Sequence, residues 1–300
     1  MENNIKIATV CGLCAGCTLA INETQKAVSQ NKNVTLFKEI VHNKNVNAML
    51  QSKGVNFCDE LEHLPKDHTI ILRAHGEPEA TINHLLSNGY SFIDCTCINV
   101  KNIHNAVSTH SNQDEKIIII GKYGKHSGAM HPEILGTVGW CKTEPILIED
   151  EDDISKLESF SNTKFYLVCQ TTFNIEKADK LIEKISALTT KNGCDLEVNK
   201  SICLAQKQIN LSSQKLAKEC DLMIVVGGKN SSNTTELFNG LKPITKSIFI
   251  EDIYSFEAEL EANNISLSKD IKIGLTAGAS TMKSELETLK TLLSNKIKEL

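Results

Sequence analysis

Three cysteines at comparable places in the chain are the first candidates for chemistry. Cys14, Cys97 and Cys203 each stand at the start of a segment with helical spacing, and 83 and 106 residues separate them. A thiolate at a helix N-terminus has a lowered pKa, because the helix dipole and the free N–H groups stabilise the anion. Three such thiolates are suited to an iron–sulfur cluster or a zinc ion. Three separate buried thiols are the simpler alternative.

Further cysteines lie close to the first of these. Cys11, Cys14 and Cys17 are spaced three residues apart, as in a ferredoxin, but the fourth cysteine and the proline of such a run do not follow. Cys14 and Cys17 would share one face of a helix. A local cluster at residues 11–17 is therefore an alternative to a site that joins distant cysteines. The chain has eleven cysteines and is large enough to fold without disulfides, so we expect metal or redox chemistry in a reducing compartment.

Three histidines are candidates for binding an anion. His42, His75 and His131 lie in predicted loops at strand ends, and Arg73 is the only arginine of the chain. Without arginine pairs, an anionic ligand must be held by histidines, hydroxyls, amides or helix N-termini. A single loop histidine is usually only solvated, but three in such positions favour an anion site.

Two polar turns and one glutamate complete the candidates. Residues 227–233 and 276–280 follow apolar strands and are rich in small, hydroxyl and amide side chains. Small residues let backbone N–H groups approach phosphate oxygens, although serine-rich turns are also common in structural roles. Glu133, beside His131, would serve as a proton donor in a site that excludes water. An isolated glutamate is more often exposed.

Composition excludes several classes of protein. Of 300 residues, 41% are hydrophobic and 23% charged, which excludes a disordered or collagen-like chain. The net charge of −5 gives no basic field for nucleic acid. No apolar run approaches the length of a membrane span and the first residues do not resemble a signal peptide, so we expect a cytoplasmic protein without membrane association.

Apolar segments of strand length alternate with helical patterns along the chain. This alternation predicts parallel sheets covered by helices. The predicted strands are residues 5–10, 55–58, 69–73, 92–94, 116–120, 165–169, 222–226, 247–250 and 271–275, and predicted helices include 18–29, 45–53 and 78–88.

The three cysteine segments form a weak internal repeat whose intervals each have the length of a small α/β domain. We therefore predict three α/β domains: residues 1–97 with Cys14, 98–199 with Cys97 at its start, and 200–300 with Cys203. Ligands of open α/β sheets bind beyond the carboxyl ends of the strands, where the cysteine loops fall. The three cysteines would then meet at a common centre.

Taken in order, these segments resemble the LytB family of 4-hydroxy-3-methylbut-2-enyl diphosphate reductases. The resemblance covers nearly the whole chain, and the combination of motifs is specific although each motif is short. The motifs are Gly12-Leu13-Cys14-Ala15-Gly16, Val41-His42-Asn43, Ala74-His75-Gly76, Asp94-Cys95-Thr96-Cys97, His131-Pro132-Glu133, Gly136-Thr137, Gln170-Thr171-Thr172, Ile202-Cys203 and residues 229–233 and 276–280.

The resemblance implies a fold and a cofactor. The fold would be a pseudo-threefold trefoil of three α/β domains with mostly parallel sheets around a central [4Fe–4S] cluster. Cys14, Cys97 and Cys203 would hold the cluster and leave one iron open to the substrate hydroxyl. Two electrons from a ferredoxin or flavodoxin, with two protons, would expel water and leave isopentenyl and dimethylallyl diphosphate.

The resemblance also implies roles for side chains around the cluster. Glu133, Thr171 and His131 would be catalytic, with Glu133 delivering the proton and Thr171 contacting the substrate hydroxyl. The positions that match the diphosphate-binding residues are His42, His75, His131, Ser231, Ser232, Asn233 and Ser280.

The chain also departs from the family pattern. Cys11, Cys17 and Cys95 are additional thiols, and the loop at residues 121–130 is longer than in the pattern. We expect the three thiols to flank the cluster without being needed for it. Two alternatives stay open: a divergent paralogue that reduces another substrate, and a non-catalytic iron–sulfur redox sensor or electron carrier.

Overall fold

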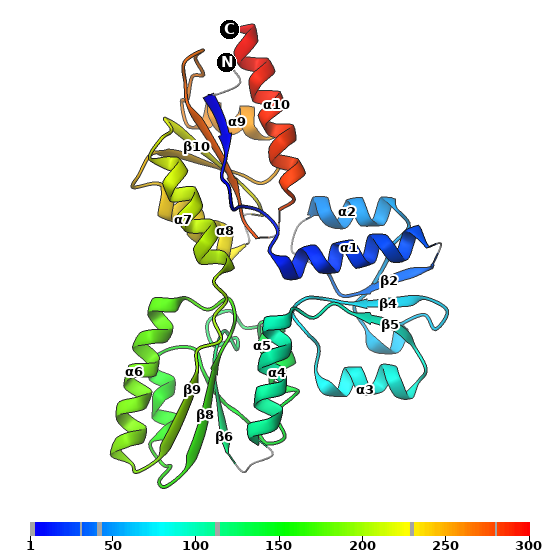
Figure 1. The fold of residues 1–300 in the computed structure, drawn as a ribbon, viewed down its shortest axis with the longest axis vertical. Coiled ribbons are helices and arrows are strands. Elements are labelled where there is room, and N and C mark those ends of the chain that lie inside the picture. The colour runs from blue at the N-terminus through cyan, green and yellow to red at the C-terminus, as the bar shows by residue number, and fades with distance from the viewer. Residues whose placement is uncertain (1–3, 31, 41–43, 112–114, 229–230, 280) are drawn as a thin grey trace. The chain divides into compact units, whose positions relative to one another are not determined.

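The structure, a computed structural model, describes residues 4–30, 32–40, 44–111, 115–228, 231–279 and 281–300, without the side chains of residues 44, 45 and 232 (Figure 1). The chain forms two compact units. One comprises residues 1–21, 39–55 and 204–300, and the other residues 22–38 and 56–203.

Three four-stranded sheets form the framework, and every strand pairing in the described residues is parallel. The first unit holds the sheet β1 (Ile5–Ile7), β12 (Ile273–Ala277), β10 (Leu222–Val226) and β11 (Lys246–Ile250), in that order. The second unit holds two sheets. Their orders are β3 (Asn56–Cys58), β2 (Val34–Phe37), β4 (Thr69–Leu72), β5 (Ser91–Asp94), and β7 (Ile146–Ile148), β6 (Lys116–Ile120), β8 (Lys164–Cys169), β9 (Asp195–Asn199).

Helices connect the strands, as parallel pairing requires. They are α1 (Ala15–Ser29), α2 (Lys44–Ser52), α3 (Glu79–Ser87), α4 (Ile98–Ser111), α5 (Pro132–Val138), α6 (Ile175–Lys191), α7 (Ala205–Ala217), α8 (Ser232–Leu241), α9 (Phe256–Ala262) and α10 (Lys283–Glu299), with short 3-10 helices η2 (Leu61–His63) and η3 (Glu151–Leu157).

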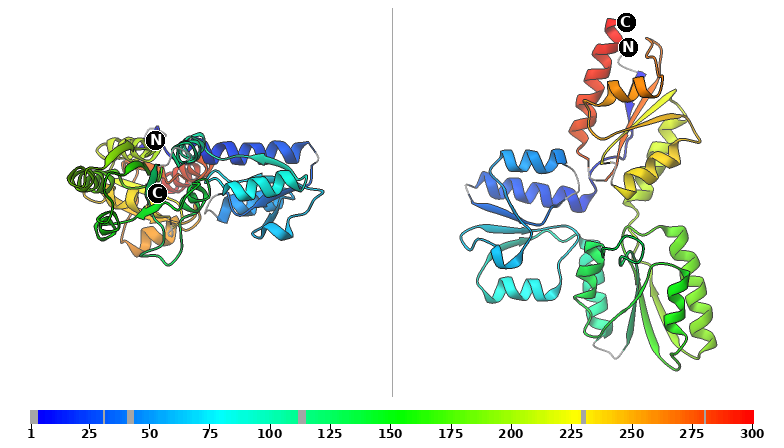
Figure 2. Two further views of the ribbon diagram at one scale, coloured as in Figure 1. Left: turned by 90° about the horizontal axis from the view of Figure 1, so that it is seen from below. Right: turned by 180° about the vertical axis from the view of Figure 1, so that it is seen from behind.

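The sheet of β6 to β9 is covered on both faces. Because successive side chains of a strand point to opposite faces, Ile118 packs with Leu181 of α6 and Ile119 packs with Val107 of α4. Figures 1 and 2 show α6 and α4 on opposite sides of this sheet. A strand buried on both faces is apolar throughout, which is why the continuous run at residues 116–120 is a reliable strand signal.

The sheet of the first unit follows the same rule. Ile224 of β10 packs with Leu289 of α10 on one face, and Val225 packs with Leu237 of α8 on the other. In the third sheet, Leu72 of β4 packs with Leu85 of α3.

The predicted fold class is confirmed: the chain is an α/β protein with three parallel sheets covered by helices. The predicted bounds of β6 and β10 match the structure, whereas the first strand ends at Ile7 rather than at residue 10. β1 pairs with β12, so the first strand of the chain belongs to the same sheet as the last. The three domain boundaries stay a prediction.

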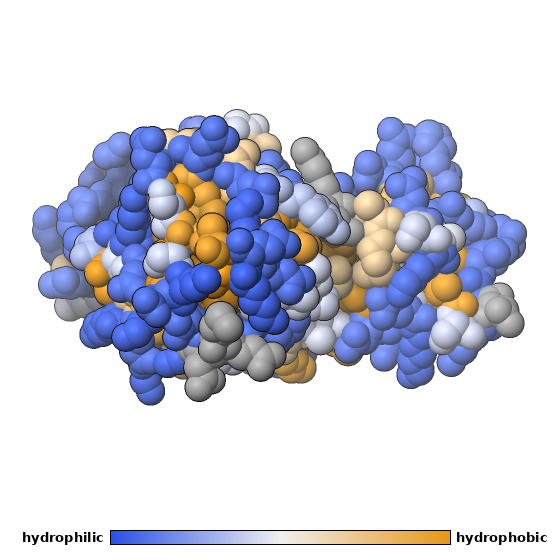
Figure 3. Space-filling model, turned by 90° about the horizontal axis from the view of Figure 1, so that it is seen from above, coloured by the Kyte–Doolittle hydropathy of each residue, from blue (hydrophilic) through white to orange (hydrophobic). Residues whose placement is uncertain are grey.

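The surface drawn in Figure 3 is mostly hydrophilic, with hydrophobic residues in small groups between the polar ones. Among the described residues, no helix combines the length and the apolar character that a membrane crossing requires.

Candidate active site

The structure places all three predicted cluster ligands at helix starts. Cys14 and Cys97 directly precede α1 and α4, and their carbonyl oxygens accept the first helical hydrogen bonds, each 2.9 Å long. Cys203 lies two residues before α7. All three side chains are partly exposed. Among the described residues, no three histidine, cysteine or acidic side chains are gathered as a set of metal ligands.

Cys14 is held in the first unit by the segment that follows β12. The Cys14 N–H donates to the carbonyl of Ala279 at 3.3 Å, and the N–H of Leu13 donates to that of Thr281 at 2.9 Å. Gly12 has φ +77°, and a Cβ there would lie 2.8 Å from the Thr281 oxygen, so the turn requires glycine.

The Cys14 sulfur is surrounded by hydrogen-bond donors. A hydrogen bond from the Cys17 thiol, assisted by the backbone N–H groups of Cys17 and Gly16, lowers the pKa of Cys14 to about 6 in spite of its burial. Cys14 therefore carries a thiolate near neutral pH, which is the form that binds metal.

The other two predicted ligands lie in the second unit, and α4 links them. Asn99, in the first turn of the helix that Cys97 begins, donates from Nδ2 to the Cys203 sulfur at 3.4 Å. The Cys203 N–H donates to the Thr171 carbonyl at 2.8 Å, and the Cys97 N–H to that of Ala74 at 3.0 Å. The sequence did not single out Asn99, because only the fold brings residues 99 and 203 together.

Glu133 is buried beside Thr171. The side chain is only 2% exposed, and it accepts the Thr171 N–H at 2.6 Å and the Thr171 hydroxyl at 2.7 Å. Burial raises the pKa of Glu133 to about 7, although both hydrogen bonds act in the opposite direction. The expectation that an isolated glutamate at this position is exposed is wrong, because the turn after β8 covers it. Thr171 thus contacts Glu133 through its side chain and Cys203 through its carbonyl.

Two of the three predicted anion-binding histidines come together. The rings of His75 and His131 lie edge to face with centroids 5.6 Å apart. His131 caps α5, where its Nδ1 accepts the Glu133 N–H at 3.2 Å. In neutral His131 the proton therefore resides on Nε2, which makes that atom a hydrogen-bond donor. His42 and Ser280 lie outside the described residues.

A buried ion pair fixes the turn that carries His75. Arg73 Nε donates to Glu77 Oε1 at 2.8 Å, and Lys38 Nζ lies 3.5 Å from Glu77 Oε2. The Glu77 carbonyl accepts the indole N–H of Trp140, which follows α5, at 3.0 Å. The only arginine is thus 7% exposed and bound to a carboxylate. The inference that an anionic ligand relies on other donors is consistent with this arrangement.

His104 of α4 packs directly beneath the same turn. Gly76 has φ +78°, and a Cβ there would meet His104 Cε1 at 2.5 Å. The ring stacks on Trp140 with centroids 5.3 Å apart, and its buried Nε2 has no hydrogen-bond partner in the described part of the chain. Burial lowers the pKa of His104 to about 4, so the ring is neutral at physiological pH.

The polar turn after β10 lies in the first unit. Ser231 caps α8, and its hydroxyl oxygen accepts the Thr234 hydroxyl at 3.0 Å and the Thr234 N–H at 3.4 Å. The Asn233 carbonyl accepts from Gln206 at 3.4 Å. The side chain of Ser232 lies outside the described residues. The backbone N–H groups of this helix start suit an anion.

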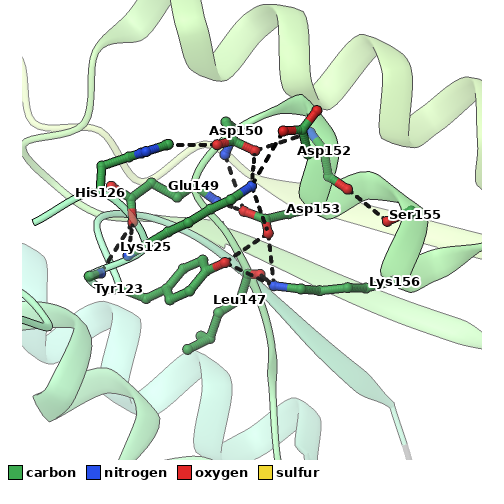
Figure 4. A network of polar contacts seen from close by, with 11 residues as sticks. Tyr123, Lys125, His126, Leu147, Glu149, Asp150, Asp152, Asp153, Ser155 and Lys156 are labelled. Carbon is green, nitrogen blue, oxygen red and sulfur yellow. Dashed lines mark hydrogen bonds and ion pairs between the residues drawn. The ribbon is translucent and has the colours of Figure 1, made fainter. Parts of the chain in front are cut away.

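The long loop at residues 121–130 is anchored rather than loose. Lys125 Nζ lies 2.5 Å from Asp150 and 3.4 Å from Asp153, and His126 Nε2 lies 2.7 Å from Asp150 (Figure 4). Tyr123 donates its hydroxyl to Asp153 at 2.7 Å. These interactions hold the loop on the acidic turn that begins η3.

Hydrogen bonds also join the two ends of the loop to each other and to the turn after β8. The His131 N–H donates to the Lys122 carbonyl at 2.9 Å, and the Lys122 N–H donates to the side chain of Gln170 at 2.9 Å. Gln170 precedes Thr171, so the loop, His131 and Thr171 share one hydrogen-bonded framework.

Comparison with known proteins gives a consistent result. A family model described as "LytB protein" matches residues 5–294. A 4-hydroxy-3-methylbut-2-enyl diphosphate reductase of Clostridioides difficile (strain 630) is 33% identical over 293 residues, covering 97% of this chain and 99% of the relative. A reductase of the same name from Ehrlichia ruminantium (strain Gardel) is 33% identical, covering 93% of this chain and 82% of the relative.

Solved structures of such reductases are also similar. The structure of (E)-4-hydroxy-3-methyl-but-2-enyl diphosphate reductase, described as the terminal enzyme of the non-mevalonate pathway, has a TM-score of 0.76 and 29% identity, covering 97% of this chain and 99% of that one. The E-1-hydroxy-2-methyl-but-2-enyl-4-diphosphate reductase from Plasmodium falciparum has a TM-score of 0.79 and 25% identity, covering 97% and 88%. The chain belongs to the LytB family.

Proposed function

We propose that this protein is a 4-hydroxy-3-methylbut-2-enyl diphosphate reductase. The reaction consumes the allylic alcohol diphosphate, two electrons and two protons, breaks the bond from carbon to the hydroxyl, and releases water with isopentenyl or dimethylallyl diphosphate. The observation that carries the proposal is the buried Glu133–Thr171 pair, placed next to Cys203 through the Thr171 carbonyl. A buried acid whose pKa is near 7 is typical of a site that transfers protons, which favours the reductase over a sensor or an electron carrier.

Cys14, Cys97 and Cys203 are the residues that would hold a [4Fe–4S] cluster. The donor chemistry fits: all three are partly exposed cysteines at helix starts, and Cys14 lies among donors that stabilise its thiolate. When bound, the cluster supplies electrons and a Lewis-acidic iron for the substrate hydroxyl.

Glu133 and Thr171 would handle the proton. Near pH 7 the Glu133 carboxyl is able both to hold and to release its proton, because its pKa is about 7. It delivers a proton to the leaving hydroxyl, and such a positioned acid contributes typically 10²–10⁴-fold to the rate. Thr171 holds the carboxyl in place through two hydrogen bonds and orients the substrate hydroxyl.

The diphosphate would be bound mainly by neutral donors. The Nε2 atom of His131, with His75 beside it, offers donors in the second unit, and the helix start at Ser231 and Asn233 offers hydroxyl and amide groups in the first. We include His42, Ser232 and Ser280 in this set by resemblance to the family. A ferredoxin or flavodoxin as electron donor and a cytoplasmic location belong to the same proposal.

The test is anaerobic purification followed by iron and sulfide analysis and turnover with a chemical reductant. We expect about four irons per chain and formation of both products from the diphosphate. Serine variants of Cys14, Cys97 and Cys203 should each lose the intact cluster, whereas the control Cys58→Ser should keep it, because the Cys58 thiol donates to the Glu60 carbonyl.

The role of Glu133 as a proton donor is tested separately, in protein that contains the cluster. Glu133→Gln should bind the diphosphate but turn over at least about 100-fold more slowly, and the partly exposed control Glu79→Gln should be unaffected. A full cluster without turnover of this substrate in the parent protein would contradict the proposal and favour the paralogue or the sensor. A full cluster in the Cys97 and Cys203 variants would favour the local run at residues 11–17.

A further inference from the structure

Cys17 has no place in the proposed reaction, yet it contacts one of the proposed ligands. Cys14-Ala15-Gly16-Cys17 forms a Cys-x-x-Cys sequence that follows β1 and begins α1. Cys14 occupies the capping position of the helix, Cys17 is its third residue, and a hydrogen bond joins the two sulfurs. Both residues are partly exposed.

Cys11 has the same spacing on the other side of Cys14 but a different environment. Its sulfur donates to the Ala8 carbonyl at 3.1 Å, and its side chain packs against the apolar residues of the β1–β12 sheet. Burial raises the pKa of Cys11. Cys11 and Cys17 are each three residues from Cys14, but their surroundings differ. Substitution of Cys11 is therefore a matched control for substitution of Cys17.

We propose that Cys14 and Cys17 form a reversible disulfide whenever Cys14 does not hold iron. Residues three apart in a helix have Cβ atoms about 5–6 Å apart, and a disulfide requires about 3.5–4.5 Å. A side-chain hydrogen bond already joins Cys17 to Cys14, and Cys14 lies just before the first residue of α1. The N–H groups of the first helical turn make no helical hydrogen bonds, so this turn is able to bring the two Cβ atoms closer.

A low-molecular-weight disulfide such as oxidised glutathione is a sufficient oxidant. The Cys14 thiolate attacks one sulfur of the oxidant and releases the first glutathione thiolate. Cys17 gives its proton to solvent and attacks the Cys14 sulfur of the mixed disulfide, which releases the second. In total the two protein thiols lose two electrons and two protons, and one glutathione disulfide becomes two glutathione molecules.

The consequence for the protein rests on the proposed role of Cys14 as a cluster ligand. The disulfide removes Cys14 from the ligand set, so the cluster assembles only after the pair is reduced. It also shields Cys14 from irreversible oxidation to the sulfinic acid. The bond thus couples cluster loading to the thiol redox state of the surroundings.

The experiment uses full-length protein freed of iron with a chelator, reduced anaerobically and then treated with oxidised glutathione. Mass spectrometry of the peptide from residues 7–26 should show the loss of two hydrogens, with Cys11 still open to alkylation. Cys17→Ser and Cys17→Ala should instead carry one glutathione on Cys14. Cys11→Ser should behave as the parent.

Iron uptake is the second measurement, and it separates this proposal from the proposed function. The oxidised parent should take up less than about a tenth of the iron of the reduced parent and recover on reduction, whereas Cys17→Ala, after reduction, should load fully. Absence of the 14–17 disulfide with normal loading overturns the inference and leaves the proposed function intact. Equal loading of the oxidised and reduced parent, with the 14–17 disulfide shown by mass spectrometry to be present during loading, would mean that Cys14 is not a ligand, which overturns the proposed function.

Discussion

Replacing Glu133 by glutamine should stabilise the protein, and increasingly so as the pH rises. Glutamine has nearly the same shape, its oxygen still accepts the Thr171 N–H, and its amide donates to the Thr171 hydroxyl. Glutamine lacks the negative charge that the Glu133 carboxyl carries at high pH, where the side chain is buried and only 2% exposed.

The size of the effect follows from the pKa of Glu133, which is raised from 4.5 to about 7 by burial. The pKa of Glu133 is higher in the folded state than in the unfolded chain. As the pH rises, the unfolded chain therefore releases this proton first, and the contribution of Glu133 to the free energy of unfolding falls between pH 4.5 and pH 7. The two pKa values differ by about 2.5, and each pKa unit corresponds to 1.36 kcal/mol, so the free energy of unfolding changes by about 3 kcal/mol. The variant should thus exceed the parent by about 3 kcal/mol in free energy of unfolding at pH 8 and match it near pH 4.5.

The assay is urea unfolding of cluster-free protein at pH 4.5, 6, 7 and 8, followed by circular dichroism. The control is Glu79→Gln, in which a partly exposed carboxylate paired with Lys142 is lost. A constant difference between Glu133→Gln and the parent at all four pH values would refute the reasoning, because it would show that Glu133 keeps the same charge throughout.

Three further variants probe the surroundings of the site. Glu77→Gln leaves Arg73 buried without its carboxylate and should lower the free energy of unfolding by about 3–5 kcal/mol in urea denaturation. The parent should lose about 3 kcal/mol relative to His104→Gln between pH 6.5 and 4, because the folded-state pKa of His104 is lowered to about 4 and the unfolded chain takes up a proton first. The difference in free energy of unfolding between the two proteins across that range checks this, because the Glu133 contribution is common to both. Lys125→Ala frees the loop at residues 121–130 from its acidic anchor and should speed proteolytic cleavage there, measured by mass spectrometry of timed digests.

Each of these three variants has a control variant at an exposed or partly exposed residue. Glu79→Gln should change stability by less than about 1 kcal/mol. His63→Gln should keep the acid sensitivity, because His63 is exposed. Lys184→Ala removes an exposed lysine paired with Glu151 and should leave loop cleavage unchanged. A Glu77 variant as stable as the Glu79 control would contradict the view that the ion pair holds the His75 turn.

The sequence predicts the strands that are buried on both faces better than the others. β10 is an uninterrupted apolar run, β6 is four isoleucines after Lys116, and the predicted bounds of both match the structure. β9, at the edge of its sheet, alternates apolar and exposed polar residues, and its pattern does not stand out from a loop. The pairing of β1 with β12 joins the two ends of the chain, and no local pattern reveals it.

In the candidate site, too, local features are predictable from the sequence and long-range contacts are not. Residue types and spacing single out the cysteines at helix starts and the three loop histidines, because these depend on local chain geometry, whereas the contact between His75 and His131 comes from the fold. The burial of Glu133 depends on a turn 38 residues away, and the contact between Asn99 and Cys203 spans 104 residues. Long-range contacts of this kind decide the charge state of a side chain, so the chemistry of Glu133 emerges only from the fold.

The hydrogen bonds around Cys14 have a consequence for the order of events during synthesis. The backbone of Leu13 and Cys14 is held by Thr281 and Ala279, and β1 finds its partner only in β12. A ribosome makes Cys14 265 residues before Ala279. The Cys14 backbone therefore waits for its hydrogen-bond partners through that stretch of translation, and the helix start that carries its thiol takes its final position only after residues 279–281 have been made.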